Sequence, residues 1–260
     1  MTKATMQRLK GKTALITGAS RGIGRSIAQA YAAEGADVVV TGRTRPDLES
    51  LVSEIRNEYG TRAVAVSGSV SRAEDVRHAV DTTLKEFGRI DILVNNAGIP
   101  GPVKNLQDIT EAEWDEVIDT NVKGVFLFTK QVLPHMLAQK SGNIVNISSG
   151  AGEKHSRMRR VRSIPYNVSK FALEGFNNVL ASSLAGTGVN VNALKPGPLK
   201  TAFHSHTPPE ILKEMEQRTG LPGADYANPV ALYLASLTPG ELNGESIDVT
   251  TWIKDHPSSK

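Results

Sequence analysis

The 260-residue sequence contains no cysteine and no long apolar run. Without cysteine the chain can have no disulfides, no thiolate metal ligands and no cysteine nucleophile. Each apolar run is shorter than the roughly 18 residues that a membrane-spanning helix needs. The first residues, MTKATMQRLKGK, lack the apolar segment of a secretory signal peptide. We therefore expect a cytoplasmic protein with no membrane partner.

The sequence also lacks a large excess of charge of either sign. Its net charge is +3, and residues 153–162, here called the basic insert, alone contribute +4 through five basic residues and one acidic residue. The rest of the chain is therefore close to neutral. A nucleic-acid-binding domain carries a broad basic surface instead, so we expect no nucleic-acid partner.

Short apolar segments rich in valine and isoleucine alternate with segments of helical periodicity. The expected strands cover residues 12–17, 36–41, 62–67, 90–94, 143–147, 189–194 and 246–249. The expected helices cover residues 22–34, 46–59, 71–87, 110–137 and 166–185. Apolar strands separated by helices are typical of a parallel sheet covered on both faces. We predict a single α/β domain over residues 1–260, with a doubly wound (Rossmann) parallel sheet.

Local signals mark two further features of this chain. Ser71 and Glu74 form a capping-box pattern, which predicts the start of the third helix. Residues 200–228 are rich in proline and break the alternation. Long irregular segments in compact domains are often lids, so we expect a substrate lid there.

The first expected strand runs into a glycine-rich turn, TGASRGIG at residues 17–24. Gly18 permits a tight turn, Gly22 lets the backbone approach a pyrophosphate, and Gly24 lets helix and strand pack closely. The N–H groups and the dipole at the helix N-terminus favour an anion. The strand–turn–helix context predicts a dinucleotide site in preference to a glycine turn without a ligand.

Four motifs together resemble those of the classical short-chain dehydrogenase/reductase family, in particular its acyl-carrier-protein reductase-like members. The glycine turn has the spacing GxxxGxG, residues 95–98 read NNAG, residues 166–170 contain YxxxK, and residues 195–201 contain a PG motif. The resemblance implies hydride transfer between a nicotinamide cofactor and a carbonyl or secondary alcohol substrate. We also expect a homo-oligomer, a dimer or a tetramer, because symmetric homo-oligomers are common among soluble proteins.

The resemblance assigns the chemistry to Ser149, Tyr166, Lys170 and Asn121. Tyr166 and Lys170 are four residues apart on an expected helix and share a face. A nearby ammonium lowers the pKa of a tyrosine from near 10, which suits proton transfer. Ser149, with Ser148 as the fallback, would bind the substrate oxygen, and Asn121 would help to hold Lys170 and a proton-relay water. An ordinary surface Tyr–Lys pair is the alternative.

The cofactor expected here is NADP in preference to NAD. The strand end at residues 40–44, VTGRT, lacks the acid that holds a ribose 2′-hydroxyl. Arg43, with Arg21, offers a guanidinium for a 2′-phosphate, although both could be solvated surface charges. By resemblance, Ser69 and Val70 lie at the adenine and Leu199 and Thr201 at the carboxamide. The full set of expected cofactor-binding residues is Thr17, Gly18, Ser20, Arg21, Gly22, Ile23, Gly24, Arg43, Ser69, Val70, Asn96, Ala97, Gly98, Tyr166, Lys170, Pro196, Gly197, Leu199 and Thr201.

The chain departs from the family pattern next to the expected site. The gap between Ser149 and Tyr166 is longer than in acyl-carrier-protein reductase-like members and contains the basic insert. The insert could recruit an anionic or carrier-bound substrate, or it could be a solvated charge run. His204 and His206 in the lid are interpreted as polar residues, and no metal site is expected.

Two other functions stay open on the same fold. A non-catalytic NADP-binding sensor or scaffold would not need Tyr166 and Lys170. An isomerase or dehydratase would use that pair, but those enzymes usually carry a larger substrate domain. Because one fold hosts many activities, the substrate does not follow from these motifs.

Overall fold

A computed structural model describes residues 7–153, 163–201, 203 and 209–257. Residues 154–162 of the basic insert, and His204 and His206 of the expected lid, lie outside the described residues.

Seven parallel strands in the described residues form one sheet in the order β3-β2-β1-β4-β5-β6-β7. The strands are β1 (Thr13–Thr17), β2 (Asp37–Gly42), β3 (Ala63–Ser67), β4 (Ile92–Asn95), β5 (Gly142–Ile147), β6 (Val189–Lys195) and β7 (Ser246–Asp248). Every strand expected from the sequence is present within a few residues of its predicted bounds. The predicted doubly wound α/β fold is therefore confirmed.

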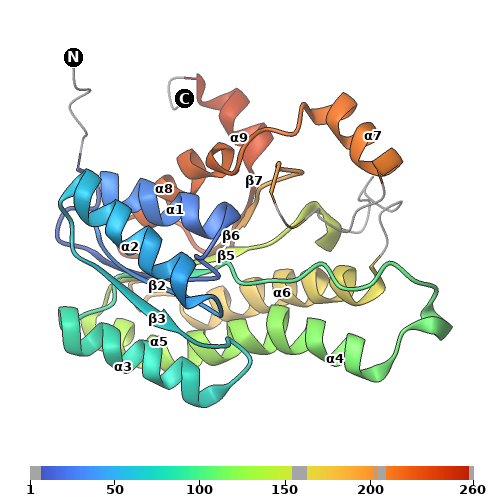
Figure 1. Ribbon diagram of the computed structural model, residues 1–260. Helices are drawn as coiled ribbons and strands as arrows, with labels where there is room; N and C mark the ends of the chain where they lie inside the picture. Colours follow the sequence, from blue (N-terminus) through green and yellow to red (C-terminus); the bar gives the residue numbers. More distant parts are fainter. Residues whose placement is uncertain (1–6, 154–162, 202, 204–208, 258–260) are drawn as a thin grey trace.

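Helices cover both faces of this sheet (Figure 1). The helices are α1 (Gly22–Ala33), α2 (Arg45–Tyr59), α3 (Ala73–Phe87), α4 (Glu111–Ile118), α5 (Gly124–Gln139), α6 (Ile164–Ser183), α7 (Pro209–Thr219), α8 (Asn228–Ala235) and α9 (Val249–Asp255). Helices α1, α2 and α8 lie on one face, and α3, α5 and α6 lie on the other (Figure 1). None of the helices in the described ranges has the length and apolar character needed to cross a membrane.

Two apolar cores follow from this layering. One contains Ile16, Val40 and Ile27 and lies between the sheet and α1, α2 and α8. The other contains Leu15 and Phe128 and lies between the sheet and the opposite helices. Because Leu15 and Ile16 are adjacent and both are fully buried, β1 is apolar on both faces, as a central parallel strand must be.

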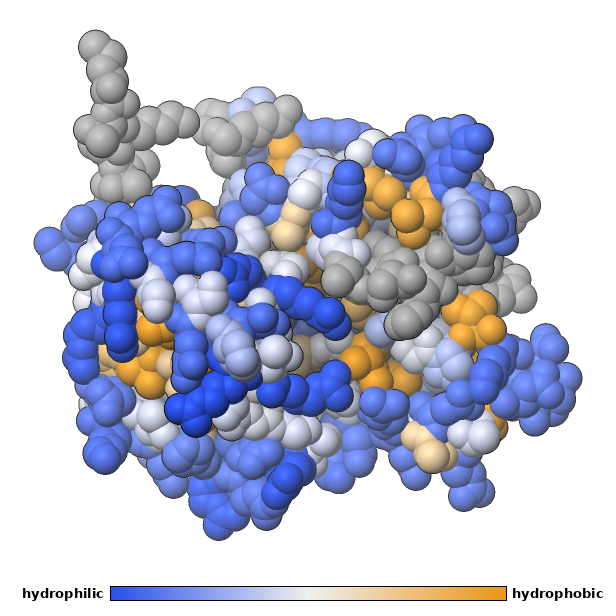
Figure 2. Space-filling view, viewed as in Figure 1, coloured by the Kyte–Doolittle hydropathy of each residue, from blue (hydrophilic) through white to orange (hydrophobic). Residues whose placement is uncertain are grey.

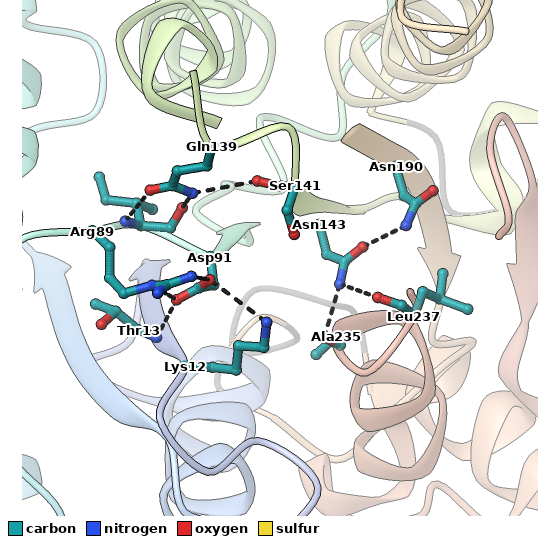
Figure 3. Close-up of polar contacts among 11 residues, drawn as sticks. Lys12, Thr13, Arg89, Asp91, Gln139, Ser141, Asn143, Asn190, Ala235 and Leu237 are labelled. Carbon is teal, nitrogen blue, oxygen red and sulfur yellow. Dashed lines mark hydrogen bonds and ion pairs between the residues drawn. The ribbon is translucent and has the colours of Figure 1, made fainter. Parts of the chain in front are cut away.

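The amino ends of the central strands carry a dense polar network (Figure 3). The buried Asp91 carboxylate accepts hydrogen bonds from Nε and Nη2 of Arg89 at 2.8 and 2.6 Å and from the Thr13 N–H at 2.9 Å. The Asn143 amide donates to the carbonyls of Ala235 at 2.9 Å and Leu237 at 3.0 Å. The bonds of Asp91 connect β1 with the residue before β4, and those of Asn143 connect β5 with the end of α8.

The predicted capping box at Ser71 is wrong. Helix α3 begins at Ala73, and Arg72, its N-cap residue, makes no side-chain cap. The Ser71 hydroxyl is instead 2.9 Å from that of Ser69, while Asp75 accepts the Ser69 N–H at 2.8 Å. A hydroxyl–hydroxyl contact before the helix has replaced the expected cap.

The expected lid is more regular than predicted, because residues 209–219 form α7. Pro209 at the start, Glu210 in the first turn and Gly220 at φ +70° after the end are all normal helix-boundary residues. This helix was not predicted because the prolines around it were taken as signs of irregular structure. Helix α6 also begins earlier than predicted, since Pro165 fits the first helical turn and Ser163 caps it.

Candidate active site

The expected site residues gather at the carboxyl ends of the strands. Strands β1 and β4 are neighbours in the sheet although β2 and β3 lie between them in the sequence. The strand order therefore reverses at β1, and crevices for ligands form at such switch points. The glycine turn after β1 and the NNAG segment after β4 lie on either side of this point.

The glycine turn has the backbone geometry that the sequence predicted. Gly18 has φ +64°, and a Cβ added there would lie 2.7 Å from Cα of Ala97. A Cβ on Gly24 would lie 2.6 Å from the carbonyl oxygen of Gly18. Only glycine permits this turn and this close approach of α1 to the loop.

Hydrogen bonds from the NNAG segment hold this turn in place. The buried Thr17 hydroxyl accepts the N–H groups of Asn96 and Ala97 at 2.9 and 3.1 Å and donates to the Val94 carbonyl. The Asn96 amide donates to the carbonyls of Thr17 at 2.8 Å and Gly18 at 3.0 Å. Thr17 and Asn96 thus position the loop through bonds inside the protein.

The start of α1 is suited to an anion. Its N-cap, Arg21, has an extended backbone and makes no side-chain cap. In the described part of the chain, no cap therefore occupies the N–H groups of Gly22 and Ile23. A diphosphate fits this position, because uncapped N–H groups and the helix dipole both favour negative charge. The residues present thus fit a dinucleotide.

Two arginines flank the place where a ribose phosphate would lie. Arg21 and Arg43 are exposed, and neither forms an ion pair with a carboxylate among the described residues. The Gly42 backbone brings β2 close to Ser20, since a Cβ on Gly42 would be 3.7 Å from the Ser20 hydroxyl. Ser20, Arg21 and Arg43 are therefore grouped around the ends of β1 and β2.

The PG segment also lies beside the glycine turn. Gly197 has φ +72°, and Leu199 is buried. A Cβ on Gly22 would meet the Thr201 side chain at 3.7 Å. Thr201 thus lies beside the glycine turn, and the backbone N–H of Lys200 donates to the Pro222 carbonyl at 2.8 Å.

The loop after β3 holds its own side chains in place. The Ser69 hydroxyl faces Ser71, and Val70 packs against α5, where a Cβ on Gly124 would lie 2.7 Å from its side chain. Gly98, from the NNAG segment, lies next to Asn121. The Ser69 side chain is thus held within its own loop, and Val70 is buried.

Ser149 and Tyr166, the serine and tyrosine expected to be catalytic, are in contact. The Ser149 hydroxyl forms a hydrogen bond with the Tyr166 side chain and also accepts the Ala151 N–H at 3.2 Å. Ser148, the fallback, donates to the carboxylate of Glu174. The structure therefore separates the two serines, since Ser149 faces Tyr166 and Ser148 faces away.

The expectation of a lowered pKa for Tyr166 is wrong for this structure. Burial raises the pKa of Tyr166 to about 12, and the hydrogen bond with Ser149 lowers it only in part. The Lys170 Nζ lies 5.6 Å from the Tyr166 ring centre and donates to the Ile147 carbonyl at 2.7 Å. Tyr166 is thus a protonated phenol at neutral pH, the form that a proton donor needs.

Burial also acts on Lys170, which is 6% exposed. Desolvation lowers its pKa to about 8, against a smaller upward effect from the charge of Glu174. A lysine with this pKa changes charge close to physiological pH. Such perturbed groups cluster at functional sites.

Asn121 is held by hydrogen bonds to the segment after β4 and to the residue before Lys170. It lies in a π-helical turn, Asp119–Lys123, between α4 and α5. Its amide accepts the Ile99 N–H at 2.9 Å and donates to the Ile99 carbonyl and the Ser169 hydroxyl, each at 3.0 Å. Asn121 therefore joins the segment after β4 to α6, one residue before Lys170. π-turns of this kind are frequent at functional sites.

The lid contributes one described aromatic to this site. The rings of Phe203 and Tyr166 are 5.4 Å apart at 57°. Around this region, the face shown in Figure 2 is hydrophilic overall, with apolar residues near its hollowed centre. Glu174 is the site neighbour that sequence reasoning missed, although its place four residues after Lys170 was a visible signal.

The fold and this site define a class, the dinucleotide-dependent oxidoreductases with a Tyr-x-x-x-Lys pair. A family model described as short chain dehydrogenase matches residues 12–211. The chain belongs to that family, and it is an oxidoreductase.

Its relatives include enzymes named for different substrates. The chain is 37% identical over 243 residues to 3-oxoacyl-[acyl-carrier-protein] reductase FabG of Staphylococcus epidermidis, covering 92% of this chain and 97% of that protein. It is 33% identical over 256 residues to glucose 1-dehydrogenase 2 of Bacillus subtilis, with 96% and 97% covered. Among solved structures, a variant of actinorhodin polyketide ketoreductase with NADPH superposes with a TM-score of 0.83 at 31% identity, with 92% and 95% covered.

Proposed function

We propose that this protein is an NADP-dependent carbonyl reductase, working reversibly on the matching secondary alcohol. The observation that carries the proposal is the pairing of a protonated Tyr166 with Ser149, beside Lys170, at the sheet edge that holds the glycine turn. The bound nicotinamide would supply or accept the hydride.

The residues of this chain would handle the oxygen and the proton. Ser149 and Tyr166 would both hydrogen-bond the substrate carbonyl oxygen, which polarises it and stabilises the developing negative charge. Tyr166 would then donate its phenolic proton to that oxygen. The Lys170 ammonium would stabilise the phenolate that is left.

The preference for NADP is supported by the charges around Ser20. Arg21 and Arg43 have no carboxylate partner in the described residues, whereas Arg25 and Arg45 on neighbouring surfaces pair with Glu54 and Glu49. Two guanidiniums without a carboxylate partner, at a strand end that has no acidic residue, favour binding of a phosphate over a hydroxyl.

The substrate proposal is a ketone of anionic or carrier-linked type. The relatives named above are a 3-oxoacyl-[acyl-carrier-protein] reductase and a glucose 1-dehydrogenase. The excess basic charge of this chain lies in the sequence between Ser149 and Tyr166, which supports a substrate with negative charge.

The test is to mix the protein with NADPH or NADH and a panel of ketones, including 3-oxoacyl thioesters and keto sugars. We expect loss of reduced-nicotinamide absorbance that requires the ketone and is faster with NADPH. Tight NADPH binding without turnover would support the sensor. Substrate conversion without net nicotinamide oxidation would support an isomerase or dehydratase.

A homo-oligomer and a cytoplasmic location also remain predictions. Apolar side chains are exposed on α5 and α6, on the same face of the sheet, at Phe126, Val168, Phe171 and Val179. A second copy of the chain is the occupant proposed for this face, since symmetric contacts bury the same patch twice. Light scattering on wild type and Phe171→Glu should show a dimer or tetramer that the variant weakens.

A further inference from the structure

Glu174 lies on α6 one turn after Lys170 and two turns after Tyr166, so that the three side chains follow one face of the helix. Its Oε1 atom accepts hydrogen bonds from the hydroxyl of Ser148 and, at 3.0 Å, from that of Ser246. Ser148 follows β5, and Ser246 begins β7. One carboxylate therefore connects two strands to the helix that carries Tyr166 and Lys170.

The bond to Ser148 fixes the backbone that carries Ser149. Ser148 is 2% exposed, and its N–H donates to the Leu194 carbonyl at 2.8 Å. Its side chain is held by Glu174, so that the residue is anchored on two sides. Ser149 follows with an extended backbone, φ −161°. A displacement of Ser148 would shift the hydroxyl that meets Tyr166.

The same carboxylate acts on the charge of Lys170. Burial favours the neutral amine, and the negative charge of Glu174 favours the ammonium. The turn Gly150–Gly152 packs tightly over both residues, since a Cβ on Gly152 would lie 2.8 Å from the Lys170 carbonyl oxygen and 3.2 Å from Cγ of Glu174.

The other charged groups around α6 are exposed or paired with residues other than Lys170. On α6 itself, Tyr166 and Glu174 are the titratable neighbours of Lys170. The remaining carboxylates of α4, Glu111, Asp115 and Glu116, are exposed. On the elements that pack against α6, carboxylates pair with lysines as Glu153–Lys195, Asp119–Lys123 and Glu113–Lys104.

We propose that Glu174 is a positioning residue of this enzyme, which holds Ser149 in place through Ser148 and keeps Lys170 in its ammonium form. The inference rests on the function proposed above, because the phenolate left on Tyr166 needs that ammonium. A purely structural Glu174 would affect stability without changing the charge of Lys170.

The decisive variant is Glu174→Gln, which keeps an acceptor oxygen for the serines and removes the charge. The direct measurement is the titration of Lys170 by NMR, in protein labelled at the lysine Cε and with the signal assigned by its loss in Lys170→Met. We expect the midpoint to fall by about one pH unit. At pH 8 this leaves about a fifth of the wild-type ammonium, and kcat should fall in proportion as the alkaline limb moves to lower pH.

Two controls separate charge from hydrogen bonding. Ser246→Ala removes one donor and keeps the carboxylate, and Glu153→Gln removes a nearby carboxylate that pairs with Lys195. Both should leave the Lys170 midpoint unchanged. Glu174→Asp should restore most of the midpoint.

An unchanged Lys170 midpoint in Glu174→Gln would overturn this inference, whatever the activity. If wild type reduces no carbonyl at all, the proposed function fails, while the NMR titration still decides whether Glu174 sets the charge of Lys170.

Discussion

The two ends of the strands use polar residues in opposite ways. At the amino ends, the carboxylate of Asp91 accepts three hydrogen bonds and lies 3.7 Å from the Lys12 Nζ, all from within the protein (Figure 3). At the carboxyl ends, Lys170 is buried with one carbonyl as its described acceptor, and Arg21 and Arg43 have no carboxylate partner in the described residues.

This difference separates stability from chemistry within one sheet. Polar groups that satisfy one another stabilise and rigidify a fold. Groups buried without full compensation cost stability, but they are available to a ligand. We therefore expect substitutions at the carboxyl ends to alter catalysis more than stability, and substitutions at the amino ends to do the reverse.

The largest effect expected is the loss of turnover in Tyr166→Phe. The variant keeps the ring that packs on Phe203 and loses the proton donor, which is worth about a hundredfold to ten-thousandfold in rate. Steady-state kinetics should show this loss in kcat, while NADPH affinity, measured by fluorescence titration, stays within about twofold. Full activity in this variant would remove Tyr166 from the chemistry.

Next in size is the stability cost of burying Lys170. Its pKa is about 8 in the fold and near 10.5 in the unfolded chain, so that the unfolded state binds more protons between these values. Burial of the Lys170 ammonium lowers the unfolding free energy of the wild type, and this loss is recovered as the pH rises from about 8 to 10.5. Lys170→Met should be more stable at pH 7 by about 1–3 kcal/mol. Urea unfolding at several pH values should show the two proteins converging, and parallel curves would contradict a lowered pKa.

Asp91→Ala tests the amino ends. It leaves the buried Thr13 N–H without its acceptor and breaks the pair with Arg89, which is partly exposed and keeps some solvation. Together these should cost about 2–3 kcal/mol of unfolding free energy. Urea unfolding should report this loss, while kcat, measured well below the unfolding temperature, should stay unchanged. A large fall in kcat would break the separation between the two ends.

The sequence was sufficient for the features that depend on local pattern. Val38, Val39 and Val40 in β2 are buried on both faces, so their unbroken apolar run predicted a central parallel strand. The turn at Gly18 and Gly24 was predicted because the backbone geometry itself demands glycine. The pairing of Ser149 with Tyr166 came from the family resemblance, since 17 residues of sequence separate them.

Features that depend on tertiary packing could not be predicted in this way. The pKa of Tyr166 is raised because neighbouring elements bury it, which spacing along a helix does not reveal. The π-turn directs the amide of Asn121 to Ile99 and Ser169, which the sequence pattern did not reveal. In the sequence Glu174 cannot be distinguished from an exposed acidic residue of a helix. Its contacts depend on β5 and β7, which place two serines beside it.

The smallest effect expected concerns cofactor choice at the edge of the site. Arg43 is exposed at the end of β2, so a contact with a 2′-phosphate would be a charged hydrogen bond worth about 1.5 kcal/mol, or roughly tenfold. Arg43→Ala should therefore raise the KM for NADPH about tenfold and leave the KM for NADH and the kcat nearly unchanged. The matched control is Arg45→Ala, two residues away, where the guanidinium already pairs with Glu49 and the KM for NADPH should not change. An equal rise in KM for both cofactors in Arg43→Ala would mean that the guanidinium does not distinguish NADPH from NADH. The residues at the carboxyl ends would then still be expected to catalyse the reaction, but Arg43 would not explain a preference for NADPH.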